Sequence, residues 1–295
     1  SGLVGSEMCI RDSHLLDGKV YFELPVDLIN KDMLIGSTVT SISDNGNAVV
    51  GSKPTDLLHV MFTRNKTHVQ LRQVNTDYIT GSTQIDEALR KSTLGAIISN
   101  QKIQAYNNDS TAIVFDMTGV FLSDNKKMSP FDRNSIYGMY NRTENYQSDC
   151  SYISQIKAFK DNVSIKSCLS YTFSVSNSQG ASLIKDRPFT AEMTRSIMLL
   201  KEKPYRPRMA DYRIGVFFTG REQLGEGAKT TAPVYYANRW DIQPSDTAAY
   251  LRGEKVKPTK QIVFYIDNTF PEKWKPYLRE GVTQWNELFE QIGFK

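Results

Sequence analysis

The sequence has few residues that could bind a metal ion or build a disulfide scaffold. It contains three histidines and three cysteines in 295 residues. Cys9, Cys150 and Cys168 form neither a C-x-x-C pair nor a zinc-ribbon spacing, which excludes a disulfide-rich scaffold and a zinc ribbon. No H-E-x-x-H pattern occurs, although hydrolytic zinc sites typically place two histidines on one helix face in this way. We therefore expect no cofactor and no metal in this chain.

Long hydrophobic runs and a strong charge of one sign are also missing. The longest apolar stretches, 94–98 and 111–115, are strand-sized, whereas a transmembrane helix needs about 18 residues. The formal net charge is +4, and basic and acidic residues are mixed along the whole length. The sequence thus predicts no transmembrane segment and no nucleic-acid partner. Hydrophobic residues at 40% and aromatic residues at 11% are enough for a sizeable core.

Common catalytic motifs are absent as well. No G-x-S-x-G pattern is present, which removes the commonest serine-hydrolase signal. Residues 220–230 superficially resemble a phosphate loop, but three residues stand between the second glycine and Lys229. The carboxylates show no spacing that identifies an acid and base pair. No catalytic residue is predicted in this chain.

The first thirteen residues, SGLVGSEMCIRDS, fit no element of the pattern that follows. They have no basic start and no apolar core, so they are not a signal peptide. The stretch LVGSEMCIRDS closely resembles a translated sequencing adapter. We expect residues 1–13 to be an artefactual or disordered leader and the true amino terminus to be missing.

From residue 19 onward the pattern alternates with period two and predicts antiparallel strands. In 58–72, a two-residue turn at Asn65-Lys66 would place Val60 opposite Leu71 and the histidines at 59 and 68 too far apart to chelate one ion. Further strands or hairpins are expected at 32–42, around 107–109 and around 161–162, with a short helix at 85–94. Cys150 and Cys168 are about five positions out of register in the last hairpin, so whether they are bonded stays open.

The composition changes after Gly220. Residues 221–258 are rich in Gly, Thr, Pro and charge, which is typical of a connecting segment. Residues 261–266 are expected to form a strand, and 271–294 a helix that has Pro276 near its start and Gly293 at its end. Burying its aromatic residues would contribute about 2 kcal/mol each, so this helix face predicts a partner.

Basic residues are concentrated in KEKPYRPRMADYR, residues 201–213. The guanidinium forks of Arg206, Arg208 and Arg213 are suited to surround the Asp211 carboxylate, which predicts a structural loop. No aromatic stacking platform accompanies them, so nucleic-acid binding is not favoured.

Four motifs stand out in this part of the sequence: RPRMADYRIGVF at 206–217, NRW at 238–240, PEKWKPY at 271–277 and GVTQWNELF at 281–289. Together they resemble the large bacterial zinc-dependent metalloproteases, which carry a metzincin-like catalytic domain. Tyr212 stands where proline is usual, and Trp240-Asp241 replaces a more basic pair. The family-motif candidates, expected to be structural, are Arg206, Arg208, Asp211, Arg213, Arg239, Trp240, Trp274, Gly281, Trp285 and Phe289.

The resemblance implies an α+β chain in which a mainly antiparallel β-rich domain, 14–220, precedes the first strand and helix of a truncated catalytic domain, 259–295. The zinc ligands and glutamate base would lie downstream, so this chain alone is predicted to be inactive. Zinc is expected in the full-length parent, with the missing catalytic domain as a partner and proteins or peptides as substrates. Export to the periplasm, outer membrane or medium is also implied. The alternative is a self-contained β-rich binding or adhesion module without enzymatic activity.

Overall fold

A computed structural model describes residues 12–159, 162–202, 205–225 and 231–295. Contacts divide the chain into two compact units. Unit 1 comprises residues 1–204 and 221–234, and unit 2 comprises residues 205–220 and 235–295. The suspected leader lies almost entirely outside the described residues, as does the end of the stretch that resembles a phosphate loop.

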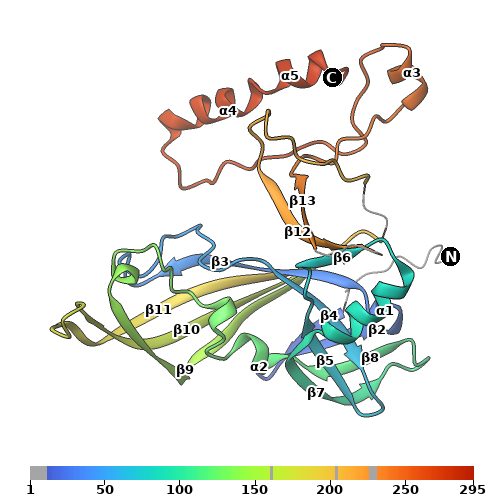
Figure 1. Cartoon of the computed structure of the whole chain (residues 1–295). Helices are drawn as coiled ribbons and strands as arrows, with labels where there is room; N and C mark the ends of the chain where they lie inside the picture. Colours follow the sequence, from blue (N-terminus) through green and yellow to red (C-terminus); the bar gives the residue numbers. More distant parts are fainter. Residues whose placement is uncertain (1–11, 160–161, 203–204, 226–230) are drawn as a thin grey trace. The chain divides into compact units, whose positions relative to one another are not determined.

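Unit 1 is built on one ten-stranded sheet in the order β1-β2-β8-β7-β5-β4-β3-β11-β10-β9 (Figure 1). All of its neighbouring strands pair antiparallel, which confirms a mainly antiparallel β-rich fold. The last strand, β9, also approaches β1 and β2, so the sheet is nearly closed. The strands are β1 (Asp12–Leu16), β2 (Lys19–Pro25), β3 (Asp32–Ile42), β4 (Leu58–Arg64), β5 (His68–Gln73), β7 (Ala96–Tyr106), β8 (Ala112–Asp116), β9 (Asn141–Ala158), β10 (Asn162–Ser176) and β11 (Ser182–Leu199).

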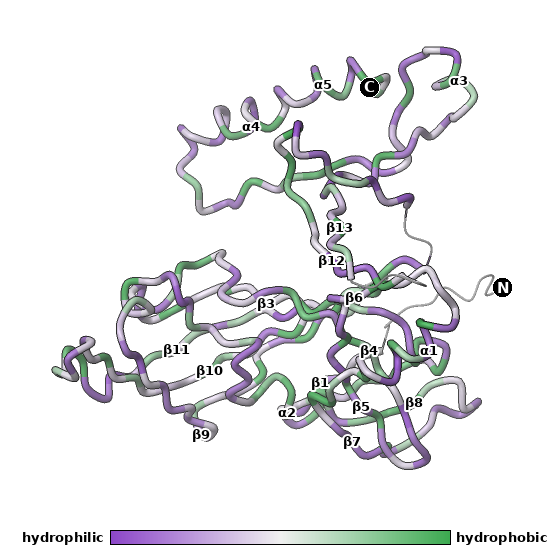
Figure 2. Tube along the Cα trace, viewed as in Figure 1, coloured by the Kyte–Doolittle hydropathy of each residue, from purple (hydrophilic) through white to green (hydrophobic). Residues whose placement is uncertain are grey.

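Alternation along these strands decides which face is buried, because successive side chains of a strand point to opposite faces. In β10, the odd-numbered residues from Val163 to Val175 are buried. Opposite them in β11, the odd-numbered residues from Phe189 to Ile197 are buried. Hydrophobic and hydrophilic positions alternate along the strands in Figure 2. The inward face of the sheet is therefore the core of unit 1.

The core consists of two hydrophobic clusters. The first centres on four phenylalanine rings, Phe22, Phe62, Phe115 and Phe121, whose closest centroids are 5.7–6.4 Å apart. The second lies towards the other end of β10 and β11 and contains Phe131, Tyr171, Phe173 and Phe189. Burial of these rings supplies the main favourable term for folding unit 1.

A segment of short helices covers the inward face of the sheet. It contains α2 (Thr118–Phe121), η2 (Lys126–Met128) and η3 (Tyr137–Met139), and it buries Val120, Phe121 and Met128. Arg142 on β9 holds this segment, because its guanidinium lies 4.7 Å from the Phe131 ring centroid and its Nη1 donates to the Ser135 hydroxyl at 3.2 Å. Another short helix, η1 (Val26–Leu28), follows β2.

The predicted β4–β5 hairpin is present, but its predicted register is wrong by two residues. Val60 pairs with Gln73 and Phe62 with Leu71, since the turn residues are Lys66 and Thr67. The side-chain oxygen of Asn65 accepts hydrogen bonds from the backbone N–H groups of Thr67 and His68, at 2.9 and 2.8 Å. This local bond fixes a turn one residue later than the sequence pattern suggests. A shift of two positions keeps every side chain on its predicted face.

Several other predicted elements are confirmed. The strand at 32–42 is β3, and the hairpin around 107–109 joins β7 to β8. The hairpin around 161–162 joins β9 to β10, with residues 160–161 outside the described range. The short helix is α1 (Thr83–Ser92), and the side chain of Ser82 accepts a hydrogen bond from the Ile85 N–H. In unit 1, Glu222, Gln223 and Leu224 of β12 (Phe218–Leu224) pair in parallel with β6 (Tyr78–Thr80).

The described residues between 221 and 258 contain more secondary structure than a simple connection would. They contain most of β12, all of β13 (Ala232–Ala237) and the helix α3 (Thr247–Leu251). The predicted strand at 261–266 is wrong: its residues form no strand, although sequence composition favours one. A strand needs a neighbour to satisfy its backbone, and no ladder is formed here.

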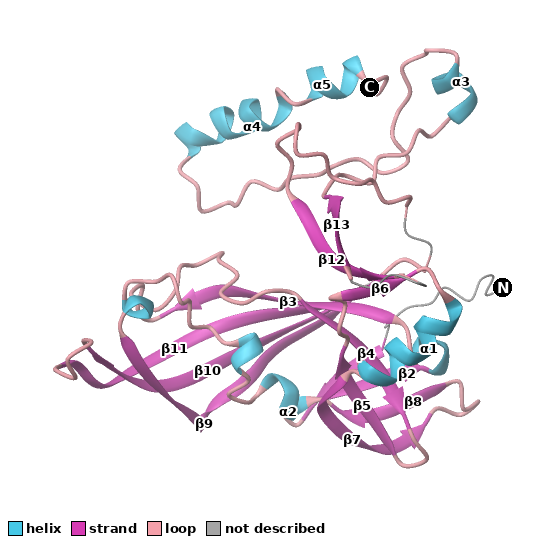
Figure 3. Cartoon of the chain, in the orientation of Figure 1, coloured by secondary structure: helices cyan, strands magenta, loops and turns pink. Residues whose placement is uncertain are grey.

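The predicted helix at 271–294 is divided into shorter helices, shown in Figure 3. They are η4 (Glu272–Trp274), α4 (Lys275–Thr283) and α5 (Asn286–Gln291). Pro276 stands in the first turn of α4, and Gly293 ends the helical region with a φ of 95°, as the sequence predicts. No helix among the described residues is long and apolar enough to cross a membrane.

Candidate functional site

The candidate site is an apolar groove within unit 2, with a volume of about 740 Å³. Its walls come from three segments of that unit: the Trp240 region, the extended residues after Pro258, and α4 with α5. Trp240 and Phe264 meet edge to face, with ring centroids 6.3 Å apart. The apolar lining residues are Trp240, Ile242, Ile262, Phe264, Val282, Trp285, Phe289 and Phe294. The polar lining residues are Gln261, Thr283, Asn286, Glu290 and Lys295. A predominantly apolar lining of this kind suits an apolar partner surface.

The helices that line the groove leave their apolar residues exposed. No residue of η4, α4 or α5 is buried. Trp274, Trp285 and Trp240 have exposed fractions of 51%, 61% and 59%. All three tryptophans of the sequence are therefore half exposed or more, and all three lie in unit 2.

Unit 2 as a whole buries very little apolar surface. Its buried hydrophobic residues among those described are Ala249, Val256 and Phe294. The exposed large hydrophobic residues of the same unit are Met209, Tyr212, Ile214, Val216, Phe217, Phe218, Tyr235, Trp240, Leu251, Val263, Phe264, Tyr265, Phe270, Trp274, Tyr277, Leu278, Val282, Trp285, Leu288 and Ile292. Exposed apolar patches of this extent mark interaction surfaces in soluble proteins.

One end of the groove is fixed by the residues around Phe294. The Val256 N–H donates to the Gly293 carbonyl at 3.0 Å, and the Lys295 N–H donates to the Val256 carbonyl at 3.0 Å. The Tyr250 ring packs on Phe294 with centroids 5.4 Å apart, and the Tyr250 hydroxyl donates to the Ile292 carbonyl at 2.8 Å. These contacts hold the end of α5 to the segment after α3. Sequence reasoning missed this anchor, because it joins residues about forty positions apart.

The basic loop before the groove is only partly as predicted. Arg213 binds Asp211 through two hydrogen bonds, at 2.9 and 2.5 Å, and the guanidinium lowers the pKa of Asp211. Arg206 and Arg208 contribute their backbone carbonyls: Arg239 donates to the Arg206 carbonyl at 2.6 Å, and the Ala237 N–H donates to the Arg208 carbonyl. The loop is thus a structural frame in which one arginine, Arg213, binds the carboxylate.

Arg239 has a second contact that completes this frame. Its guanidinium lies 4.3 Å from the Tyr205 ring centroid, and the Tyr205 hydroxyl donates to the Arg239 carbonyl at 2.7 Å. Stacking and hydrogen bonding of this kind hold the residue next to Trp240 in place. The frame therefore positions one wall of the groove.

The remaining motif candidates lie on the helices. Gly281, Trp285 and Phe289 line the groove, and the space around Gly281 is open, because a Cβ added there would have no heavy atom within 4 Å. Trp274 lies beside Tyr277, with ring centroids 6.1 Å apart, and Lys273 lies over its ring. Four of the ten motif candidates thus line the groove together, namely Trp240, Gly281, Trp285 and Phe289.

Each histidine of unit 1 has a different hydrogen-bond or ion-pair partner. His59 Nε2 lies 2.8 Å from Asp32 Oδ1, and His68 Nδ1 lies 2.8 Å from Thr67 Oγ1. His14 pairs with Glu23 at 3.7 Å. Within the described ranges, no group of three or more His, Cys, Asp or Glu side chains could hold a metal ion. The residues present therefore offer no fit for zinc, and the expectation that the chain lacks a cofactor stays a prediction.

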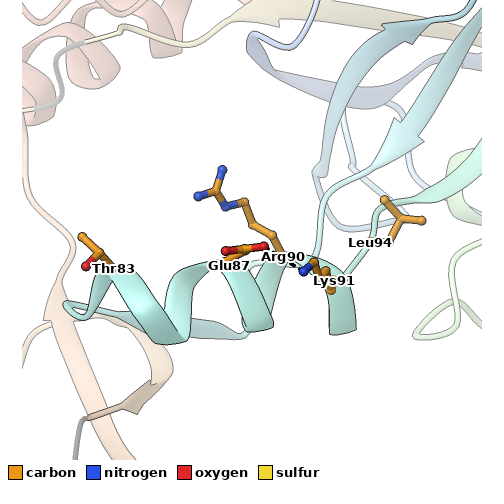
Figure 4. A pocket seen from close by; sticks show the side chains of 5 residues that line it. All are labelled: Thr83, Glu87, Arg90, Lys91 and Leu94. Carbon is orange, nitrogen blue, oxygen red and sulfur yellow. Dashed lines mark hydrogen bonds and ion pairs between the residues drawn. The ribbon is translucent and has the colours of Figure 1, made fainter.

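A shallow recess over α1 in unit 1 is a weaker candidate (Figure 4). It is lined by Thr83, Glu87, Arg90, Lys91 and Leu94, which come from this one helix and the residues just after it. Lys91 pairs with Glu87 at 2.7 Å, and Arg90 pairs with Asp86 at 2.7 Å, each within one turn. Paired charges on an exposed helix face indicate a solvated surface.

The two described cysteines are not bonded. Cys150 is exposed and Cys168 is buried, and both are free thiols. Cys168 pairs with Tyr152, and a register shift follows it, so Cys150 lies in an irregular part of β9. The sequence left open whether Cys150 and Cys168 are bonded, and in the structure they are not.

Comparison with known proteins places the chain in a family. The family model described as "Domain of unknown function (DUF5117)" matches residues 51–245, more than half of the chain. The chain belongs to the DUF5117 family. The DUF5117 region runs from the loop before β4 to the residues before α3, and it includes Trp240 but not α4 and α5. The family description names no activity, so the resemblance to metalloproteases stays a prediction.

Searches of curated proteins and of solved structures returned no match.

Proposed function

We propose that this DUF5117 chain is the amino-terminal, non-catalytic part of an exported zinc-dependent metallopeptidase. In this proposal unit 1 is the β-rich accessory domain, and unit 2 carries the first elements of the catalytic domain. The peptide-bond hydrolysis and the zinc belong to further residues of the parent, which also recognises the protein or peptide substrates. No residue of this chain is assigned a catalytic role.

The observation that carries the proposal is the uncovered apolar surface of unit 2. Aromatic rings stand exposed on η4, on α4 and on the extended segment after Pro258, and Trp285 is exposed just before α5. Trp274, Tyr277 and Trp285 are 51%, 66% and 61% exposed, so covering the rest of these rings would contribute about 1–2 kcal/mol each. Together this is a sizeable share of the roughly 5–15 kcal/mol that stabilise a typical domain. Such a surface favours a partner that completes a shared core. The DUF5117 match and the motif residues of the metalloprotease resemblance are compatible with this proposal.

The tryptophans give a direct test, because all three lie in unit 2. For the 295-residue chain we expect tryptophan emission at the wavelength typical of solvent-exposed indoles and efficient quenching by acrylamide. A chain lengthened by the downstream codons of the same gene should show shielded tryptophans. A variant with Trp240→Phe and Trp274→Phe isolates Trp285 as the single probe of the groove.

Zinc content and peptidase activity are the second part of this test. The lengthened chain should contain one equivalent of zinc by elemental analysis and hydrolyse peptides in a chelator-sensitive way. The 295-residue chain should do neither. Stoichiometric zinc with peptidase activity in the short chain, or downstream codons without an H-E-x-x-H pattern, would overturn the proposal.

The alternative function is a self-contained β-rich binding or adhesion module. The nearly closed sheet of unit 1, with its own two hydrophobic clusters, favours this possibility. It predicts that the short chain already shields Trp285 and that its unfolding is one cooperative transition. Efficient acrylamide quenching of solvent-exposed tryptophans in the 295-residue chain would exclude the binding or adhesion module.

A further inference from the structure

The segment QIVFYI, residues 261–266 of unit 2, has a backbone without hydrogen-bond partners. The structure has neither helix, strand nor turn there. Among the described residues, none forms a backbone hydrogen bond with the N–H or C=O groups of this segment. The nearest backbone bonds on either side are made by Thr259 and Asp267. A row of unpaired backbone donors and acceptors is matched by another extended chain, as at the edge of a sheet.

The side chains of this segment alternate as they do in a strand. Ile262 and Phe264 line the groove. Val263 and Tyr265 do not line it, and they are 59% and 94% exposed. Because successive residues of a strand point to opposite faces, one face of the segment belongs to the groove and the other faces solvent.

A second copy of the same segment fits this edge. Exposed segments of six residues with high β-propensity, without charge or proline, pair readily with identical segments. Edge strands of natural proteins prevent such pairing with lysine, proline or an inward-pointing charge. Residues 261–266 contain none of these devices, and no glycine interrupts them.

Two-fold symmetry restricts the register of such a pair. In an antiparallel ladder, opposed side chains lie on the same face, and a two-fold axis perpendicular to the ladder keeps equivalent faces on one side. Opposed residues are therefore both even-numbered or both odd-numbered. With the axis at Phe264, Asp267 lies opposite Gln261 of the second copy. Oδ1 of Asp267 accepts from the Thr269 N–H and hydroxyl at 2.8 and 2.6 Å, which leaves Oδ2 to face the glutamine amide.

The charge at the other end of the segment disfavours the neighbouring register. With the axis at Val263, the ammonium group of Lys260 would lie opposite Ile266 of the second copy. A charge opposite an apolar side chain loses hydration without gaining a partner. The register with Phe264 on the axis instead places Ile266 opposite Ile262, and polar residues meet polar residues at both ends.

The groove supports this ladder on one face. A two-stranded ribbon alone is marginally stable in water, and packing against helices stabilises it. The even-numbered side chains of both strands lie on the groove side, where Trp240 meets Phe264 with ring centroids 6.3 Å apart and α4 and α5 form the opposite wall. The two grooves of a dimer would thus form one continuous apolar layer.

We propose that two copies of this chain associate through an antiparallel ladder of residues 261–266, with the two-fold axis at Phe264. The ladder satisfies the backbone groups that are unpaired in one chain, and it covers the edge of the groove. This inference goes beyond the proposed function, and its test needs neither zinc nor peptidase activity.

The first test measures the mass of the 295-residue chain by light scattering over a range of concentrations. A ladder of this length is a small interface, so the dimer should dissociate in the micromolar range. Between about 1 and about 100 µM the mass should rise from 33.5 kDa towards twice that value. A mass of one chain at every concentration, or masses that grow well beyond two chains, would overturn the proposal.

Tyr265→Lys places a charge on the ladder and should raise the Kd of the dimer at least tenfold. The Tyr265 side chain is 94% exposed, so the fold of one chain should not change, and circular dichroism checks this. The matched control is Tyr212→Lys, which makes the same replacement at a residue of unit 2 that is 98% exposed. Its Kd should equal that of the wild type. Equal Kd values for Tyr265→Lys and the wild type would overturn the proposal.

Cross-linking tests the register directly in a background with Cys9→Ser and Cys150→Ser. Phe264→Cys should form a disulfide-linked dimer on oxidation, because residue 264 lies opposite its own equivalent at a Cα separation of about 5 Å. Val263→Cys should link poorly, since its equivalents are about 8 Å apart in this register. Efficient linking through Val263→Cys but not through Phe264→Cys would overturn the proposal. If Tyr265→Lys does not fold, this comparison decides.

Discussion

Phe22→Ala tests where the stability of the chain resides. The Phe22 side chain is 0% exposed, and its ring lies 6.2–6.4 Å from the rings of Phe62, Phe115 and Phe121. Removing a fully enclosed phenylalanine leaves a cavity as well as losing burial, which costs about 3–5 kcal/mol. This is a large share of the roughly 5–15 kcal/mol that stabilise a typical domain.

The matched control is Trp285→Ala, which removes a larger ring from the groove in unit 2. Trp285 is 61% exposed, so less than half of its surface is protected in this chain and the expected loss is about 1 kcal/mol, confined to unit 2. Urea unfolding followed by circular dichroism reports on the strands of unit 1, and tryptophan fluorescence reports on unit 2.

We expect Phe22→Ala to lower the circular-dichroism midpoint by about 1.5 M urea, for an m-value of about 2.5 kcal/mol/M. Trp285→Ala should leave that midpoint within about 0.3 M. Equal losses in the two variants would refute the reasoning, because they would mean that the helices of unit 2 are covered as well as the phenylalanine cluster is.

Three further predictions concern two glycines and the two described cysteines. Gly293→Ala should destabilise the contact between the end of α5 and Val256 by about 1–3 kcal/mol, because φ at Gly293 is 95° and an added Cβ would lie 2.7 Å from Tyr250 Cε2. Hydrogen exchange at the Val256 amide should become faster. Gly281→Ala, in a helix with open space around it, should instead stabilise the protein by about 1 kcal/mol. Equal effects at the two glycines would contradict the argument. Cys150 should react with a thiol reagent in the folded chain and Cys168 only after unfolding, as mass spectrometry with Cys150→Ser as control would show; rapid labelling of Cys168 would contradict its burial.

The sheet of unit 1 could be predicted in outline, because period-two alternation is a local property of the sequence. It predicted β3 and the hairpins that join β7 to β8 and β9 to β10. The register of the β4–β5 hairpin could not be predicted in the same way. One side-chain oxygen, on Asn65, decides between two turns that place the same residues on the same face.

The candidate site was predictable in composition but not in geometry. The spacing of apolar residues after Pro271 predicted a helical segment with one hydrophobic face, and α4 and α5 carry that face. That Trp240 and Phe264 form the opposite wall depends on a chain path that no local pattern encodes. The strand expected at 261–266 was wrong because strand formation requires a neighbour, and composition alone does not provide one.

Arg195 shows most clearly the difference between what local sequence patterns determine and what long-range contacts determine. Alternation along β11 places it inward by itself, since residues 189, 191, 193 and 197 are all apolar and buried. Whether a carboxylate lies there to pair with it depends on strands and loops far away in the sequence. The sequence by itself determined the faces of the strands and the apolar character of the last helices, because these follow from backbone periodicity. The tertiary structure alone decided which charges and rings meet, because those contacts are made between segments that local rules do not connect.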